Sequence, residues 1–252
     1  QETLFIAVST QKGGVGKTAL TVLLSSYLHY LKNYNVAIVD CDYPQYSING
    51  MRERDKKIVM EDPHYKALFY KQSKELNKKA YPIEVSRATE AIEVAKALVI
   101  ESVMPLDFVF FDLPGTINAK GVLSTLAQMD YVFTPITADR MVLESSLEYA
   151  ALINEQIITT GKGKIKDLYL LWNLVDAREN AHLYDVYEDV IAELGLQIMK
   201  THLPDTKRFR REITTEYRPV FRSTLLPADK QLIKGSNLDE IVDEFLRIVK
   251  GE

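Results

Sequence analysis

Residues 4–18 of this chain read LFIAVSTQKGGVGKT, and this stretch decides the fold. Its first half is an apolar run of strand length, and its second half is rich in glycine and ends in Lys17 and Thr18. Residues 17–32 then carry apolar side chains at helical spacing. A strand, a glycine-rich turn and a helix in this order form an anion site, because the N–H groups of the turn point inward and the helix N-terminus adds positive charge.

The glycine-rich segment predicts a binding site for nucleotide phosphates. Its glycines permit a tight turn and a close approach of the phosphates, Lys17 suits the β and γ oxygens, and the Thr18 hydroxyl suits Mg²⁺. The common pattern is G-x-x-x-x-G-K-[ST], but Gln11 stands at its first glycine and Lys12 adds a second lysine. We therefore expect ATP and Mg²⁺ as ligands, and ATP hydrolysis as the reaction. The expected phosphate contacts are Lys12, Gly13, Gly14, Val15, Gly16, Lys17, Thr18 and Ala19.

Outward from this loop, strand-like and helix-like patterns alternate along the chain. Apolar runs of strand length recur at 36–40, 108–112, 131–135, 168–174 and 196–201, and helical patterns lie at 143–157, 181–194 and 238–249. This alternation predicts a doubly wound, mostly parallel sheet in a three-layer α/β/α domain over residues 1–252. Residues 51–105 are highly charged, with a helical pattern around 84–103, and predict a helical excursion that either covers the sheet or presents a surface to a partner.

Composition excludes several classes of protein. The 252 residues carry a formal net charge of −4, which gives no general support for nucleic-acid binding. The single cysteine, Cys41, excludes a disulfide framework and indicates a reducing compartment. No apolar run reaches the ~18 residues of a membrane helix, and the first apolar stretch lacks a basic leader. We expect a cytoplasmic protein that does not enter a membrane.

Carboxylates follow two of the predicted strands. Asp112 ends the run Phe-Val-Phe-Phe, the position of a Walker-B aspartate that holds Mg²⁺ through water. Asp40 and Asp42 follow the second strand in Val-Asp-Cys-Asp-Tyr-Pro-Gln. In a parallel sheet ligands bind beyond the carboxyl ends of the strands, so these side chains can hold the metal and the attacking water. A turn or helix-cap role for the Asp40–Asp42 pair stays open.

With these residues placed, the chain resembles the ParA/MinD group of P-loop ATPases over nearly its whole length. KGGVGKT with an early lysine is similar to the group's deviant phosphate loop, in which the residue matching Lys12 reaches across an ATP-dependent sandwich homodimer. The resemblance assigns Asp42 to positioning the attacking water and Asp40 to the magnesium shell or its support, and the two roles could be exchanged. Pro114 and Gly115 match the turn that senses the γ-phosphate.

The chain departs from the group's pattern at two positions. The group commonly has D-x-D-P-Q after the second strand, and Tyr43 is an extra residue in that segment here. Many members carry a second hydroxyl residue at the position of Ala19, so one phosphate contact worth about 0.5–1.5 kcal/mol is absent.

The resemblance also implies an adenine site and a dimer interface. Asn173, in Trp-Asn-Leu-Val-Asp, resembles the base-reading asparagine of the group, whose amide both donates and accepts. Pro204 and Asp205 match a second loop on the adenine side. Asp139 and Arg140 are interface candidates.

The implied function is a nucleotide switch in the partition or maintenance of a plasmid or a mobile element such as a conjugative transposon. A protein partner would stimulate hydrolysis. A short basic cluster either contacts DNA phosphates nonspecifically or is a solvated helix face. This cluster comprises Lys207, Arg208, Arg210 and Arg211.

Three other functions remain as alternatives. A membrane-cycling switch of the MinD type needs an amphipathic C-terminal helix, and here that segment carries acidic residues that oppose anionic lipid. An ATP-dependent biosynthetic ligase of related fold would phosphorylate a carboxylate and would need a substrate pocket. A metal-cluster carrier would need Cys41 to pair across a dimer.

Overall fold

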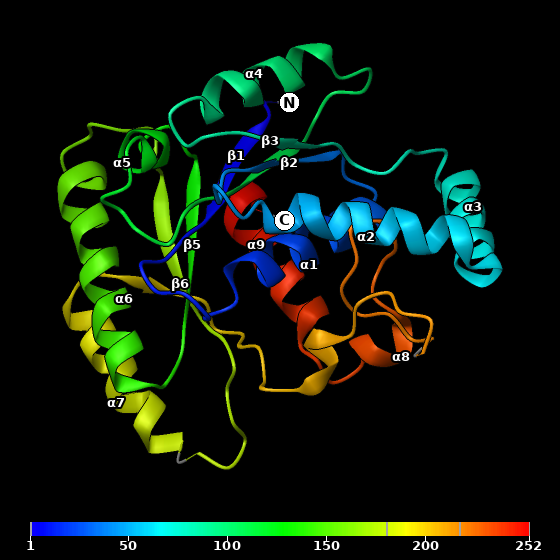
Figure 1. The fold of residues 1–252 in the computed structure, drawn as a ribbon. Helices are drawn as coiled ribbons and strands as arrows, with labels where there is room; N and C mark the ends of the chain where they lie inside the picture. Colours follow the sequence, from blue (N-terminus) through cyan, green and yellow to red (C-terminus); the bar gives the residue numbers. More distant parts are fainter. Residues whose placement is uncertain (1, 180, 217, 252) are drawn as a thin grey trace.

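A computed structural model describes residues 2–179, 181–216 and 218–251, and in this part of the chain a parallel sheet of seven strands lies between two layers of helices (Figure 1). The strand order is β3-β2-β4-β1-β5-β6-β7. This confirms the predicted three-layer, doubly wound fold. The strands are β1 Leu4–Val8, β2 Val36–Asp40, β3 Ile83–Val85, β4 Phe108–Asp112, β5 Tyr131–Ile136, β6 Asp167–Trp172 and β7 Gln197–Ile198.

The helices divide between the two faces of the sheet. Helices α1, α2 and α9 contribute to the apolar core on one face, and α4, α5, α6 and α7 contribute to the core on the other. Helix α8 adds Ile233 to the first of these cores, and α3 lies farther out, beside α2 (Figure 1). The bounds are α1 Lys17–Tyr30, α2 Ser47–Glu61, α3 Pro63–Leu76, α4 Ala91–Glu101, α5 Val122–Leu126, α6 Arg140–Ile153, α7 Ala181–Glu193, α8 Lys230–Ile233 and α9 Leu238–Lys250, with a π-helical turn η1 at Asn154–Ile158 and a 3₁₀ turn η2 at Lys207–Arg210.

Strands β2 and β4 are apolar up to the aspartate that ends each of them, because both of their faces are buried. In β4, Phe108 and Phe110 belong to the core under α1 and α9, whereas Val109 and Phe111 belong to the core on the opposite face. Successive side chains of a strand point to opposite sides, so a strand covered on both faces reads as a continuous apolar run.

The register of the strands brings the chemically active residues to one edge of the sheet. Asp112 of β4 is aligned with Val8 of β1 on one side and with Asp40 of β2 on the other. The glycine-rich loop follows Val8 directly, so the loop and both aspartates meet at the carboxyl ends of three adjacent strands.

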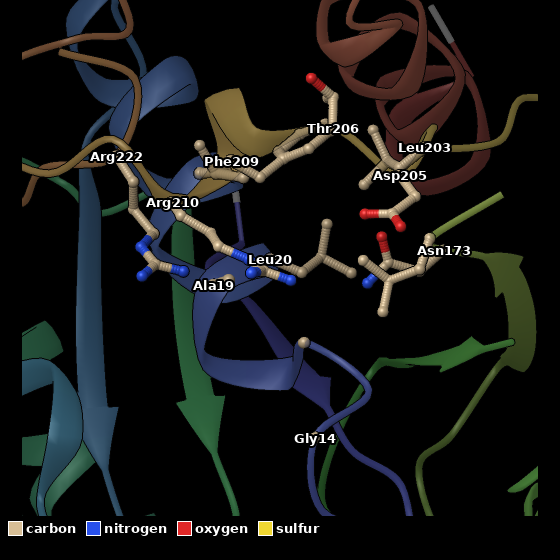
Figure 2. Close-up of a pocket in the computed structure, with 13 residues that line it drawn as sticks. Gly14, Ala19, Leu20, Asn173, Leu203, Asp205, Thr206, Phe209, Arg210 and Arg222 are labelled. Carbon is tan, nitrogen blue, oxygen red and sulfur yellow. The ribbon is translucent and has the colours of Figure 1, made fainter. Parts of the chain in front are cut away.

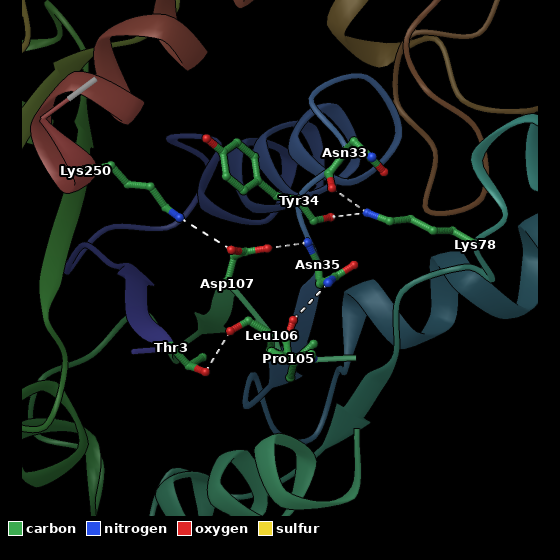
Figure 3. Close-up of polar contacts among 9 residues, drawn as sticks. All are labelled: Thr3, Asn33, Tyr34, Asn35, Lys78, Pro105, Leu106, Asp107 and Lys250. Atoms are coloured by element: carbon green, nitrogen blue, oxygen red, sulfur yellow. Dashed lines mark hydrogen bonds and ion pairs between the residues drawn. The ribbon is translucent and has the colours of Figure 1, made fainter. Parts of the chain in front are cut away.

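A polar network lies at the opposite ends of the strands, where β2 and β4 begin (Figure 3). Asp107, just before β4, accepts a hydrogen bond from the backbone N–H of Asn35 at 2.8 Å and is 3.4 Å from Lys250 Nζ. The Lys250 ammonium also lies 4.7 Å from the centre of the Tyr34 ring. These contacts hold the end of α9 against the sheet, away from the loop that follows β1.

The secondary structure of the charged segment 51–105 differs from the prediction. Ile83–Val85 pairs with β2 as an edge strand, and α4 begins only at Ala91, whereas the sequence indicated helix around 84–103. A strand of three residues is too short to show an alternating pattern, and its pairing with β2 decides its conformation. Strand β7 likewise covers only Gln197–Ile198 of the predicted 196–201.

Buried His29 should make the stability of the fold depend on pH. Burial lowers the pKa of His29 from 6.5 to about 4, although its Nε2 donates to the Lys79 carbonyl oxygen at 3.0 Å. Its other ring nitrogen is buried without a hydrogen-bond partner. The unfolded chain therefore binds a proton at higher pH than the folded chain does. This contribution to stability is complete above pH 6.5 and is lost as the pH falls toward 4.

We expect His29→Gln to reduce this loss. Between pH 7 and pH 4 the free energy of unfolding of the wild type should fall by up to about 3 kcal/mol more than that of the variant. Urea unfolding of both proteins across this range measures the difference. Parallel curves for the two proteins would show that His29 is not the group responsible.

Candidate nucleotide-binding site

The loop between β1 and α1 has the backbone of an anion site. Gly14 and Gly16 have φ angles of 81° and 89°, in the left-handed region that favours glycine. Gly16 is the N-cap of α1, and no side chain caps the first turn of that helix. The first N–H groups of α1 therefore remain available to a ligand.

Thr18 and Asp112 form the polar centre of the site. The Thr18 hydroxyl donates to Asp112 Oδ2 at 2.8 Å, and the second oxygen, Oδ1, is buried without a hydrogen-bond partner. Burial raises the pKa of Asp112 to about 7, although the nearby Lys17 ammonium favours the ionised form. A buried carboxylate oxygen without a partner is costly unless another group occupies its coordination site.

These residues fit a magnesium ion. No group of three or more histidine, cysteine or acidic side chains that could hold a metal occurs among the residues described. Mg²⁺ does not need such a cage, because it usually takes one or two protein ligands together with phosphate oxygens and water. The Thr18 hydroxyl and the free oxygen of Asp112 supply that partial set.

The two aspartates after β2 have different surroundings. Asp40 is fully buried, and its Oδ2 accepts the N–H groups of Ile48 and Asn49 at 3.0 and 2.9 Å. The carboxylate thus holds the first turn of α2, and its place in the magnesium shell stays a prediction. Asp42 is only half buried and lines the same pocket as the phosphate loop. The extra residue, Tyr43, is exposed, with the Arg87 guanidinium 5.1 Å from its ring centre.

A phosphate-side pocket joins both lysines of the loop to Asp42. The lining also includes Gln45 and Ser47 from the segment that leads into α2. Gly115 lies close by, because a Cβ built on it would be 3.7 Å from Lys17 Nζ. The predicted switch turn therefore lies near the lysine that should hold the terminal phosphates.

A second pocket, of about 180 Å³, lies on the other side of the loop (Figure 2). We name it the adenine-side pocket, because Asn173, the predicted base-reading residue, lines it. The backbone N–H of Val175 donates to the Leu203 carbonyl oxygen and that of Asp205 to the Val175 carbonyl oxygen, so the segments after β6 and β7 run side by side. Asn173 and Asp205 thereby face one pocket, whereas Pro204 forms an isolated bridge with Val175. The apolar part of the lining, which suits a flat base, comprises Ala19, Leu20, Leu23, Leu174, Leu203 and Phe209.

Asn173 is tied to the phosphate loop. Its Nδ2 donates to the Val15 carbonyl oxygen at 2.8 Å, and a Cβ on Gly16 would come within 2.5 Å of the same nitrogen. Only glycine fits at position 16. One amide hydrogen of Asn173 is thus used by the protein, and its base-reading role stays a prediction.

The residues of the predicted basic cluster have different surroundings. Arg208 Nη1 donates to the carbonyl oxygens of Leu232 and Lys234 at 3.0 and 2.8 Å, and Arg210 lines the adenine-side pocket. Lys207 and Arg211 are exposed. The interface candidates have local contacts: Asp139 accepts the N–H of Val142, and Arg140 pairs with Glu144.

Sequence reasoning missed several lining residues. Thr206 and Phe209 line the adenine-side pocket, and Arg222 lines both pockets. None of them belongs to a motif, and their approach to the loop depends on how the chain returns after β7. No pattern in the sequence predicts that these residues line the site.

Comparisons with known proteins agree with this geometry. A family model described as the CobQ/CobB/MinD/ParA nucleotide binding domain matches residues 6–220. A search of curated proteins finds no match. Among solved structures, a putative plasmid partition protein from Borrelia burgdorferi bound to AMPPNP is similar at 20% identity and a TM-score of 0.62, covering 98% of this chain and 100% of that one.

Two further structures share the fold. The MinC:MinD cell division complex of Aquifex aeolicus matches at 17% identity and a TM-score of 0.62, covering 99% of this chain and 96% of that chain. Cobyrinic acid a,c-diamide synthase of Mycobacterium smegmatis, with a bound ATP analogue and magnesium, matches at 21% identity and a TM-score of 0.57, covering 100% and 97%. The match of the family model over most of the sequence, on a fold and loop of the expected form, means that the chain belongs to the CobQ/CobB/MinD/ParA family of nucleotide-binding domains.

Proposed function

We propose that this chain is a nucleotide-switch ATPase that binds Mg·ATP, closes into a homodimer around two nucleotides and reopens after hydrolysis. One observation carries the proposal: Lys12, Lys17, Thr18 and Asp42 line a single pocket, and Thr18 is hydrogen-bonded to buried Asp112. This arrangement provides cations for phosphate, ligands for a metal and a carboxylate for water. Those are the groups that phosphoryl transfer to water requires.

Each of these residues has a distinct task in the proposed reaction. Lys17 and the N–H groups of the loop hold the terminal phosphates, and Thr18 and Asp112 fix the position of the metal. Mg²⁺, when held by Thr18 and Asp112, would supply positive charge that offsets the negative charge developing on the phosphate. Asp42 accepts a hydrogen bond from the attacking water and holds it in line. Buried Asp40 keeps the Asp42 segment in place through α2.

Lys12 is the residue that supports the dimer. It is exposed at the rim of the phosphate-side pocket, so its ammonium can meet a phosphate bound by a second copy. A cation supplied in this way would make dimerisation depend on the nucleotide, because ADP lacks the terminal phosphate charge.

Lys12→Ala should separate binding from dimerisation. We expect light scattering to detect a monomer with Mg·ADP and a dimer with Mg·ATP for the wild type, but a monomer with both for the variant. ATP affinity should change by less than about 10-fold, because Lys17 and the loop N–H groups remain. Lys57→Ala, which removes an exposed lysine of α2, is the matched control. A wild type that stays monomeric with ATP would contradict the sandwich mechanism.

The proposed cellular function is the partition or maintenance of a plasmid or mobile element in the cytoplasm. A protein partner would stimulate ATP hydrolysis. The similarity to a plasmid partition protein supports this setting. Of the predicted basic cluster, exposed Lys207 and Arg211 are the residues best suited to contact DNA phosphates.

Helix α9 does not favour the membrane-cycling alternative. The apolar face of this helix is already packed in the core beneath the sheet, so it is not available to lie in a lipid surface. The buried face comprises Ile241, Val242, Phe245, Leu246 and Val249. None of the helices in the described part of the chain has the length and apolar character needed to span a membrane.

A further inference from the structure

Arg222 lies where the two halves of the nucleotide site meet. The phosphate-side pocket and the adenine-side pocket share Gly14, Gly16, Ala19 and Arg222 in their linings. A nucleotide that extends from one pocket to the other has its base and ribose on one side of this junction and its β and γ phosphates on the other. The group at the junction itself is the α-phosphate.

The protein holds the Arg222 side chain in place. Nη2 donates to Glu212 Oε1 at 2.7 Å, and the backbone N–H donates to the Arg211 carbonyl oxygen at 3.0 Å. The other Glu212 oxygen is 3.5 Å from Arg54 Nη2. An arginine positioned by a carboxylate in this way loses little side-chain freedom when it binds a ligand.

Buried Asp55 fixes the two residues that follow Arg222. Its Oδ2 accepts the Ser223 hydroxyl at 3.0 Å, the Thr224 N–H at 2.7 Å and the Thr224 hydroxyl at 2.8 Å. Arg52, also on α2, donates to the Thr224 hydroxyl and carbonyl oxygens. The backbone next to Arg222 is therefore anchored to α2 on the side of the sheet that carries α1.

The Arg222 guanidinium retains donors that the protein does not use. Its Nε is buried without a hydrogen-bond partner, and the side chain is only 20% exposed. In Figure 2 the guanidinium points toward the first turn of α1, where Ala19 offers no hydroxyl to a phosphate. A fixed cation with unused donors, beside a helix turn in which Ala19 has no side-chain donor, is suited to an anionic ligand.

We propose that Arg222 binds the α-phosphate and replaces the side-chain contact that Ala19 cannot make. This inference rests on the proposed function, because it assumes that the two pockets hold one adenine nucleotide. ATP and ADP share the α-phosphate. Arg222 therefore sets the affinity for both nucleotides alike, whereas Lys12 responds to the terminal phosphate.

Calorimetric titration of the full chain with Mg·ATP and Mg·ADP tests this assignment. Arg222→Ala should weaken both ligands by a similar factor, about 10-fold to 100-fold, because a charge-assisted contact common to both is removed. Arg247→Ala removes an exposed arginine of α9 and should leave both affinities unchanged. Unchanged binding of both nucleotides by Arg222→Ala would overturn the inference, and so would a loss confined to ATP.

Two more variants distinguish phosphate binding from a purely structural role. In the Arg222→Ala background, Ala19→Ser returns a hydroxyl to the first turn of α1 and should restore part of the affinity for both nucleotides. Arg222→Lys keeps the charge but cannot reach Glu212 and a phosphate together, so its affinities should be intermediate. No recovery in either variant, with thermal unfolding midpoints equal to that of the wild type, would refute the proposal. If the wild type bound neither nucleotide, the proposed function itself would fail.

Discussion

Replacing Lys17 by alanine is expected to abolish Mg·ATP binding at micromolar nucleotide and to remove hydrolysis with it. Lys17 lines the phosphate-side pocket, its ammonium lies close to Gly115, and its charge acts on buried Asp112. Loss of two charge-assisted phosphate contacts, each worth about 1.5–3 kcal/mol, corresponds to a roughly 10²-fold to 10⁴-fold weaker affinity. Calorimetry with Mg·ATP measures the affinity directly.

Lys57→Ala, which removes an exposed lysine of α2 distant from the pocket lining, is the control for the change in charge. It should bind nucleotide as the wild type does. If Lys17→Ala and Lys57→Ala had equal affinities for ATP, or if the wild type took up no Mg·ATP, the site described above would not be a nucleotide site. Thermal unfolding without ligand checks that the variants are folded.

Asp42→Ala is expected to retain ATP while losing hydrolysis. The Asp42 carboxylate lines the phosphate-side pocket but makes no side-chain hydrogen bond to the phosphate loop within the described residues, so its removal should leave binding nearly intact. A residue that positions and polarises the attacking water contributes about 10²-fold to 10⁴-fold to the rate. Phosphate release by the variant should fall by that range.

Light scattering supplies the second measurement for Asp42→Ala. Without hydrolysis the variant should remain a dimer in Mg·ATP, whereas the wild type should return to a monomer as ATP is consumed. Phosphate release at the wild-type rate would contradict the role of Asp42. A monomer under all conditions, in both proteins, would instead contradict the sandwich dimer. Asp42→Asn, which keeps the size of the side chain, separates the loss of charge from the loss of packing.

The central strands and the phosphate loop could be predicted because their signals are local. Residues 4–8, 36–40 and 108–112 were expected as strands and form β1, β2 and β4 at those positions. Each of these strands is largely buried on both faces, so its sequence is apolar apart from the aspartate that ends β2 and β4. The loop is likewise contiguous, and Lys17, Thr18 and the glycines need only their neighbours in the chain to form an anion site.

Other features required contacts between distant segments. Strand β3 has three residues, and its conformation depends on pairing with β2. Nothing local to Asp40 predicts that its carboxylate accepts hydrogen bonds from the N–H groups of Ile48 and Asn49 at the start of α2. In the sequence Arg208 belongs to a cluster that either contacts DNA or is a solvated helix face, whereas in the structure its guanidinium binds two backbone carbonyl groups.

The sequence by itself therefore determined the class of fold, the phosphate loop and the position of Asp112 at the end of a strand. These features depend on short contiguous segments, in which the pattern of apolar residues and the backbone freedom of glycine decide the local structure. Only the tertiary structure decided which side chains complete the pocket. Arg222 is separated by more than two hundred residues from Ala19 in the chain, yet both line the same two pockets. A contact of that kind arises from the packing of the segment after β7 against α1 and α2, and no local pattern encodes it.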